Sequence, residues 1–287
     1  GQGYVIVSMN SSNYYSGKWE RGFYITKATV NDKTMVLTSP VYNKKAQVPS
    51  VASCKDVLGN NIPTSLFSVS ATNNVNAGNN ASATISINNS NFYSGKWTKK
   101  FTIQKAATNL ECASTVSISY NAEKELSPTS NQNESIISCK LAASSDKKIT
   151  VSKGGLIKAV TKSTGTSSSV IVIQPESNNY KRAEKTVTIR LVPAVKKATA
   201  TSAKKGVVYI EIEGDKYATY YNVYDKKDGD LLKKEITLKK EDGYKKSVKL
   251  SDLKTGSVCE VNVIPFVKTK SGDLWKGTRK SAKCTVK

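Results

Sequence analysis

Residues 10–29 read NSSNYYSGKWERGFYITKAT, and residues 88–107 read NNSNFYSGKWTKKFTIQKAA. The two stretches lie 78 residues apart, counted from position 10 to position 88. Nine residues of the first, Asn13, Tyr15, Gly17, Lys18, Trp19, Phe23, Ile25, Lys27 and Ala28, recur in the second as Asn91, Tyr93, Gly95, Lys96, Trp97, Phe101, Ile103, Lys105 and Ala106. Internal repetition at a period near 80 residues is typical of a chain with one small β-sandwich per repeat.

Each copy has the pattern of a β-hairpin. Val5 and Val7 alternate with polar residues ahead of the first copy, and Ile85 and Ile87 do the same ahead of the second. A polar N-x-Y-S-G turn follows, in which glycine adopts positive φ at little cost. After the turn, apolar residues recur mainly at even spacing, which predicts a second strand with one buried face.

The remainder of the chain also favours strands. TVSISY, SIISCKL, KITV, SSVIVI and KTVTIRLVP are short apolar runs separated by Ser, Thr, Asn and Lys, and no helical periodicity is present. A chain of 287 residues is too long for one small sandwich. We therefore expect an all-β protein of tandem immunoglobulin-like or fibronectin III-like β-sandwiches arranged end to end.

Residues 30–106 resemble the bacterial Ig-like repeats of the MBG/YDG type. The resemblance rests on Y42-N-K-K, V48-P-S-V, N74-V-N-A-G-N and N91-F-Y-S-G-K-W-T-K-K-F-T-I. The chain departs from the family at this first motif: the family has Y-x-G, whereas Tyr42 is followed here by Asn43 and Lys44, with no glycine. Residues 1–29 match only the closing hairpin of such a repeat, so we expect a partial module there.

Residues 107–194 resemble bacterial Ig-like domains of the second group (BIg2), through V151-S-K-G-G-L-I-K-A-V and N178-N-Y-K-R-A-E-K-T-V-T-I. Residues 195–287 resemble a lysine-rich bacterial fibronectin type III domain, through V207-V-Y-I-E-I, A218-T-Y-Y-N-V-Y and S247-V-K-L-S-D-L-K-T-G-S-V-C-E-V-N-V. Cys259 stands where that family places an inward tyrosine, so we expect its tyrosine corner to be missing. These resemblances imply an extracellular or cell-surface location.

The charge balance is strongly basic, with 44 Lys and Arg against 22 Asp and Glu and a formal net charge of +22. Most of the excess is lysine, and it is spread along the chain. It can serve as a solvated coat that keeps strand edges from pairing, or it can attract an anionic cell-wall polymer or acidic glycan. We do not expect a nucleic-acid partner, because no arginine and aromatic residues concentrate in one segment.

The chain contains no histidine. This excludes a Ser-His-Asp triad, a Cys-His pair and histidine-ligated zinc. We expect no enzyme activity, catalytic residue, cofactor or metal. We also expect no membrane span, because no apolar stretch reaches the roughly 20 residues that a helix needs to cross a bilayer.

The five cysteines are Cys54, Cys112, Cys139, Cys259 and Cys284. Cys259 and Cys284 fall on predicted adjacent strands and could form a disulfide or remain buried thiols. Cys112 and Cys139 fall in one module and could also pair. Cys54 has no partner in its own module.

Five aromatic residues could contact a glycan or could instead serve the sandwich cores: Trp19, Trp97, Tyr220, Tyr224 and Trp275. Three functions follow from the sequence: a stalk or adhesion region that contacts a host surface protein, a module that binds carbohydrate or anionic wall polymer, and an accessory region of a larger secreted hydrolase. The N-terminal hairpin needs a cover for its apolar residues. We expect it to dock on the next module; the alternatives are a homodimer through the same hairpin and strands supplied upstream.

Overall fold

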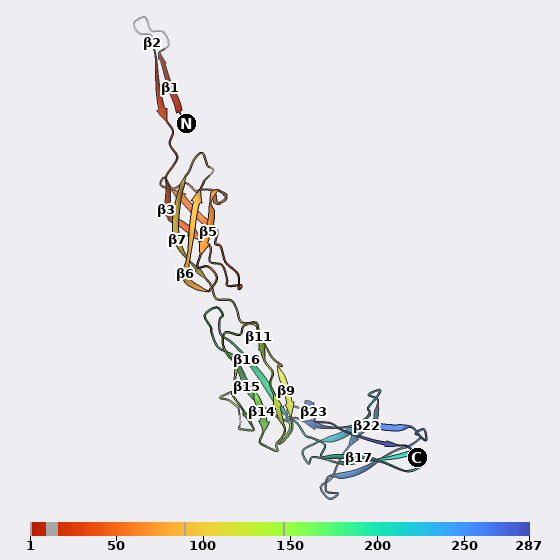
Figure 1. Cartoon of the computed structure of the whole chain (residues 1–287). Coiled ribbons are helices and arrows are strands. Elements are labelled where there is room, and N and C mark those ends of the chain that lie inside the picture. Colours follow the sequence, from red (N-terminus) through yellow and green to blue (C-terminus); the bar gives the residue numbers. More distant parts are fainter. Residues whose placement is uncertain (1, 10–16, 89, 146) are drawn as a thin grey trace. The chain divides into compact units, whose positions relative to one another are not determined.

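The computed structural model describes residues 2–9, 17–88, 90–145 and 147–287, and its order of elements can be followed in Figure 1. The regular elements of these residues are β-strands, apart from the short 3-10 helix η1 (Thr64–Leu66). The expected all-β sandwich class is confirmed. Asn13 and Tyr15 of the first repeat copy lie outside the described residues. The chain divides into two compact units, residues 1–107 with 177–181, and residues 108–176 with 182–287.

The repeated stretches form two antiparallel hairpins. The first pairs β1 (Gln2–Met9) with β2 (Gly17–Tyr24), and the second pairs β6 (Gly78–Ile87) with β7 (Gly95–Ile103). Val7 lies opposite Trp19 in the first hairpin, and Ile85 lies opposite Trp97 in the second. The two hairpins therefore share a register as well as a sequence, and the prediction of paired strands is confirmed.

Three further strands complete the sandwich around the second hairpin: β3 (Val30–Leu37), β4 (Val51–Asp56) and β5 (Ser68–Thr72). Strands β3 and β4 form one sheet, and β5-β6-β7 form the other. Their inward residues alternate with outward polar ones, as expected for sheets with one dry face. The core gathers Val30, Met35, Val51, Cys54, Ile62, Ala81, Ala83, Ile85, Ile87, Phe101 and Ile103.

Residues 177–181 belong to the same unit as this sandwich. The amide of Ala106 donates a hydrogen bond to the carbonyl of Asn179 (2.9 Å), and the amide of Ala77 donates to Asn179 Oδ1 (2.8 Å). The ring of Tyr180 meets Tyr42 edge-on, with centroids 5.4 Å apart. This short segment is therefore fixed by backbone, amide and ring contacts together.

The second unit begins with a run of short and medium strands: β8 (Leu110–Glu111), β9 (Thr115–Ile118), β10 (Glu123–Glu125), β11 (Thr129–Ser130), β12 (Ser138–Leu141), β13 (Ile149–Val151), β14 (Leu156–Ala159), β15 (Thr166–Gln174) and β16 (Ala183–Leu191). One sheet has the order β12-β15-β16-β9, and a second has the order β10-β14-β13. Their shared core includes Ile157, Val170, Val172, Val187 and Ile189, each fully buried.

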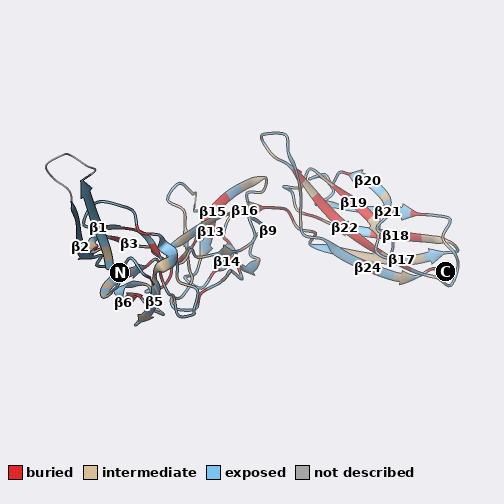
Figure 2. Cartoon of the chain, turned by 90° about the horizontal axis from the view of Figure 1, so that it is seen from above, coloured by how far each residue is buried: buried red, intermediate tan, exposed pale blue. Residues whose placement is uncertain are grey.

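The last strands of the unit form a sandwich around a core of their own: β17 (Lys197–Lys204), β18 (Val207–Glu213), β19 (Tyr220–Asp225), β20 (Leu231–Ile236), β21 (Lys245–Leu250), β22 (Val258–Lys268), β23 (Leu274–Lys276) and β24 (Lys280–Thr285). One sheet has the order β17-β18-β21; the other has β20-β19-β22-β23, with β24 also paired to β22. Figure 2 shows buried residues along β18 and β22, and the core includes Val208, Ile210, Tyr221, Val223 and Val261.

The first hairpin lacks such a cover. Tyr4, Val5, Ile6 and Val7 are more than half exposed, and Trp19 is 58% exposed. Its strands pair only with each other among the described residues. No third strand lies beside this pair among the described residues, and the expectation that the hairpin docks on the neighbouring module stays a prediction.

Candidate functional site

An outward stripe on the larger sheet of the last sandwich is the candidate carbohydrate-binding face. Tyr220 and Tyr224 lie four residues apart on β19, so their side chains share one face of the strand. The ring of Tyr220 stacks on Phe266 of β22, directly opposite in the register, with centroids 5.1 Å apart and planes 23° apart. The sheet thus brings together two of the five aromatic residues predicted from sequence and adds a third, Phe266.

Two amide side chains share this stripe. Asn222 Nδ2 donates to the Tyr224 hydroxyl (3.1 Å), and Asn222 Oδ1 accepts from the Glu235 amide (2.8 Å). Asn262 Oδ1 accepts from the Ser281 hydroxyl (2.8 Å). Burial raises the pKa of Tyr220, so its phenol stays neutral and able to donate over the physiological range. Aromatic faces beside polar groups suit a sugar ring, although these amides already have partners within the sheet.

The three tryptophans lie on three different strands, β2, β7 and β23. Trp97 of β7 packs against the core of its own sandwich. The Arg190 guanidinium lies over the ring of Trp275, 4.9 Å from the centroid, and this contact occupies one face of the indole. Trp19 of β2 is exposed. Of the aromatic residues predicted from sequence, the structure brings together only Tyr220 and Tyr224 on one strand face within the last sandwich.

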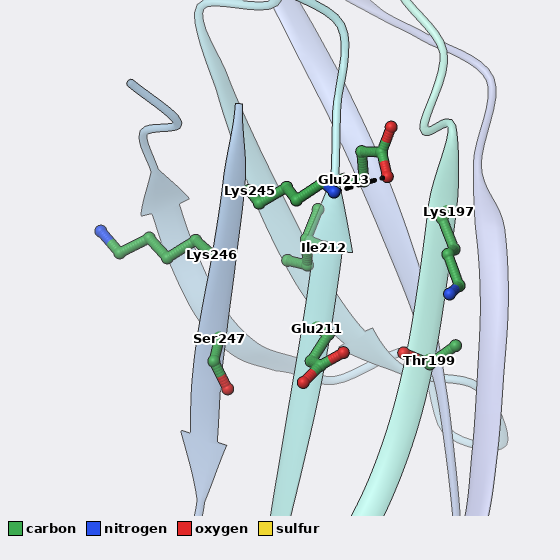
Figure 3. A pocket seen from close by; sticks show the side chains of 8 residues that line it. All are labelled: Lys197, Thr199, Glu211, Ile212, Glu213, Lys245, Lys246 and Ser247. Carbon is green, nitrogen blue, oxygen red and sulfur yellow. Dashed lines mark ion pairs between the residues drawn. The ribbon is translucent and has the colours of Figure 1, made fainter. Parts of the chain in front are cut away.

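A shallow hollow lies on the smaller sheet of the last sandwich (Figure 3). Its volume is about 360 Å3, and it is lined by Lys197, Thr199, Glu211, Ile212, Glu213, Lys245, Lys246 and Ser247. Glu213 pairs in register with Lys197 on one side and with Lys245 on the other. Lys245 Nζ lies 3.6 Å from Glu213 Oε2, and Lys246 points away from the hollow. The opposite charges largely balance within the hollow, so it is not a strong site for an anion.

Cys259 and Cys284 lie directly opposite each other on β22 and β24. Directly opposite residues of an antiparallel pair have Cα atoms about 4.5–5.5 Å apart, within the range of about 4.4–6.8 Å that a disulfide needs. Both cysteines are free thiols in the structure. Burial raises the pKa of the Cys259 thiol, and the nearby Cys284 adds to the effect.

Cys54 and Cys139 are buried in the two preceding cores, and Cys112 packs against the second of these. Burial raises the pKa of Cys139, and the nearby Cys112 raises it further. Both side chains contribute to the same apolar cluster, and both are free thiols. Cys54 is buried beside Thr34, with 4.0 Å between Sγ and Oγ1. A raised pKa keeps these thiols protonated at neutral pH, so they behave as small apolar groups rather than as nucleophiles.

Sequence reasoning missed a tyrosine contact inside the last sandwich. The Tyr221 hydroxyl donates to the carbonyl of Asp215 (3.0 Å) and accepts from the Asp215 amide (2.5 Å). The side chain is 1% exposed. Residues 217–224 contain four tyrosines, and the strand alternation around Val223 is the sequence signal that marks Tyr221 as the inward one.

The acidic segment from Asp225 to Asp230 is a hairpin turn, as its D228-G pair predicts. Asp225 Oδ1 accepts from the amides of Lys227 (2.7 Å) and Asp228 (3.1 Å), and Gly229 has a φ of 80°. Within the described part of the chain, no cluster of three or more acidic, cysteine or histidine side chains could hold a metal ion. No helix among these residues has the length and apolar character to cross a membrane.

No protein-family model matches the sequence, and a search of curated proteins finds no match either. Several solved structures resemble the fold. Extracellular domains 3–5 of Drosophila OTK align over 90% of this chain and 100% of theirs, with 8% identity and a TM-score of 0.33. Titin domains A168–A170 align over 91% and 99%, with 10% identity and a TM-score of 0.33. The D1–D4 ectodomain fragment of ICAM-5 aligns over 100% and 83%, with 10% identity and a TM-score of 0.28. Likenesses at this level carry no argument about function, and the fold assignment rests on the strand order described above.

Proposed function

We propose that this chain is a non-enzymatic, extracellular segment of a bacterial surface or secreted protein that acts as a stalk, spacer or adhesion region. Its modules would be a partial Ig-like repeat over residues 1–29, a full repeat over residues 30–106, an Ig-like domain over residues 107–194 and a fibronectin III-like domain over residues 195–287. One observation carries the proposal: three separate apolar cores draw on successive stretches of the chain, from Val30 to Ile103, from Val116 to Leu191 and from Val195 to Val286.

Separate cores favour a spacer for a physical reason. A module with its own core can unfold and refold without its neighbours, so the chain yields stepwise under load. Antiparallel sheets with polar outer faces also tolerate water on every module. The lysine coat would limit pairing between exposed strand edges of neighbouring molecules.

Pulling single molecules from both ends tests the proposal. We expect three unfolding events, with extensions of about 260–320 Å each, from roughly 3.4 Å for each residue of the three modules. A single event that releases the whole chain would contradict the proposal, because it would mean one cooperative unit. The matched variant Val170→Asp charges only the middle core, and it should remove one event and leave two.

Carbohydrate binding is a second candidate function, and the stacked pair of Tyr220 and Phe266 favours it. A glycan array with wild-type protein and Tyr220→Ala tests this function. Tyr209→Ala, on β18 of the smaller sheet, is the matched control. If Tyr220 contacts a sugar, the affinity for the glycan should fall by about tenfold in Tyr220→Ala, as for the loss of one stacking contact, and should not change in Tyr209→Ala. Equal loss from both variants would contradict a specific face.

Binding to an anionic wall polymer makes a different prediction. The contacts would be made by lysines, so affinity should fall steeply as the salt concentration rises from 0.05 M to about 0.5 M, where charges a few ångströms apart are already screened. A titration with a teichoic-acid-type polyphosphate checks this. Affinity that does not change with salt would contradict lysine-driven binding and favour the aromatic face instead.

A further inference from the structure

The first hairpin presents an apolar face whose counterpart in the second hairpin is fully buried. Val5, Val7 and Met9 correspond by the 78-residue offset to Ala83, Ile85 and Ile87, and these three are 0–3% exposed. Trp19 and Phe23 correspond to Trp97, which packs on the core, and to Phe101, which is 5% exposed. In the first hairpin the same positions are 43–58% exposed, and several of them line a hollow of about 640 Å3.

The second hairpin also shows what covers such a face. Its core is closed by Val30, Met35, Val51, Cys54 and Ile62, which come from β3, from β4 and from the loop after β4. Strand β5 adds to the free edge of β6, with Val69 opposite Ile85. The equivalent edge of β1 has no strand beside it among the described residues. The cover therefore consists of an apolar layer and one edge strand.

One charge refines the chemistry of this cover. Arg21 lies on the apolar face opposite Val5, and it corresponds to Lys99 of the second hairpin. Lys99 Nζ lies 3.7 Å from Asp32 Oδ2 of β3. A cover of the same kind would therefore place a carboxylate beside Arg21. A second copy of the hairpin fits less well, because two facing copies would bring two Arg21 side chains and no carboxylate into one dry layer.

We propose that the face formed by Val5, Val7, Met9, Trp19 and Phe23 is half of an Ig-like core and binds a strand set of the Val30–Thr72 kind that carries an acidic residue for Arg21. The partner closes the apolar layer and adds one antiparallel strand to the free edge of β1. Strand addition of this type combines backbone hydrogen bonds with alternate side-chain pockets. This inference does not depend on the stalk function proposed above.

The chain itself supplies a probe for the experiment. Residue 1 corresponds to residue 79, so a duplicate of residues 30–78 placed directly before Gly1 restores the spacing of a full repeat. Hydrogen exchange of the extended full-length protein, read on peptides from 2–9 and 17–24, measures whether the duplicate covers the hairpin. We expect exchange in both strands to slow by at least about 100-fold, as for amides that enter a core sheet. Unchanged exchange of peptides from β15 and β16 shows that the rest of the chain is folded.

Adjacent residues provide the matched variants. Val7 and Ile6 are 55% and 52% exposed, but they face opposite sides of β1. In the extended protein, Val7→Lys should abolish the protection, whereas Ile6→Lys should keep it, because the position equivalent to Ile6 is the half-buried Thr84 on the outer face. Asp32→Lys in the duplicate should reduce the protection several-fold, and Arg21→Glu should restore it.

Two results would overturn the proposal. One is a hairpin that exchanges as fast with the duplicate as without it, both in the direct fusion and in a second version joined through a flexible Gly-Ser linker. The other is a wild-type chain that sediments as a dimer at micromolar concentration and becomes monomeric with Val7→Lys, since the face would then be covered by a second copy.

Discussion

The buried hydroxyl of Tyr221 offers the sharpest test of the packing in the last sandwich. Tyr221→Phe keeps the ring in the core and removes two hydrogen bonds to the backbone of Asp215. Tyr221 is 1% exposed, and the phenylalanine ring keeps its packing contacts because only the hydroxyl is removed. The Asp215 amide then loses its hydrogen-bond acceptor. Leaving a buried donor without a partner costs about 1–3 kcal/mol. We expect the free energy of unfolding of this sandwich to fall by that amount.

The pH dependence of the same variant gives a second, independent measurement. Burial raises the pKa of Tyr221 well above its ordinary value, chiefly because the ionised phenolate would lose its hydration. The neutral phenol binds its proton more tightly in the folded state. Its contribution to stability is therefore full below pH 10 and is lost as the pH rises above the unfolded pKa of about 10. Between pH 9 and pH 11 the wild-type protein should lose about 1.4 kcal/mol relative to Tyr221→Phe.

Urea unfolding followed by the fluorescence of Trp275 measures both quantities. Trp275 is the only tryptophan beyond residue 97, so a background with Trp19→Phe and Trp97→Phe isolates the signal. A Tyr221→Phe protein within 0.3 kcal/mol of the wild type at pH 8 would refute the hydrogen-bond argument. An equal loss of stability for both proteins between pH 9 and pH 11 would refute the account of the raised pKa.

Three further changes test single contacts. A Cβ at Gly214 would lie 2.1 Å from the Tyr221 hydroxyl, so Gly214→Ala should destabilise the last sandwich by about 1–3 kcal/mol in the same urea assay. The loss should be smaller when Tyr221→Phe is also present, because the hydroxyl is then absent. A Cβ at Gly277 would lie 2.2 Å from the Pro193 carbonyl oxygen, so Gly277→Ala should lower the melting temperature. The control is Gly272→Ala, where the new methyl group would lie in open space but the backbone has positive φ. This control should lower the free energy of unfolding by only about 1 kcal/mol. Incubation with oxidised glutathione should join Cys259 to Cys284, with the loss of two hydrogen atoms in the intact mass and the release of reduced glutathione. Because Cys112 and Cys139 share one core and could also pair, the mass is read in a Cys112→Ser background. In that background Cys284→Ser should not lose the two hydrogen atoms, and an unchanged mass with Cys284 present would contradict the pairing.

Much of the fold could be predicted from the sequence, because alternation along a strand is a local property. The runs around Val116, Ile149, Val170 and Val187 were predicted as strands, and each forms one. The 78-residue repeat also predicted the shared hairpin, whereas the pairing of each tryptophan with a β-branched residue is seen only in the structure. Contacts that depend on the packing of distant segments were not predictable. The stack of Tyr220 on Phe266 joins residues 46 positions apart, and only the register between β19 and β22 brings them together.

The two hairpins show where the limit of sequence reasoning lies. Val7 and Ile85 have the same local pattern, the same register and the same tryptophan opposite, yet one is 55% exposed and the other fully buried. The pattern therefore encodes which face of a strand is meant for a core, but not whether that core is present. Burial depends on strands that come from another part of the fold, and the free energy gained from it, about 25 cal/mol for each Å2 of apolar surface, is realised only when they arrive. The residues that cover the buried face of the second hairpin therefore indicate which residues a partner of the first hairpin would carry. They include a carboxylate beside Arg21, as Asp32 lies beside Lys99.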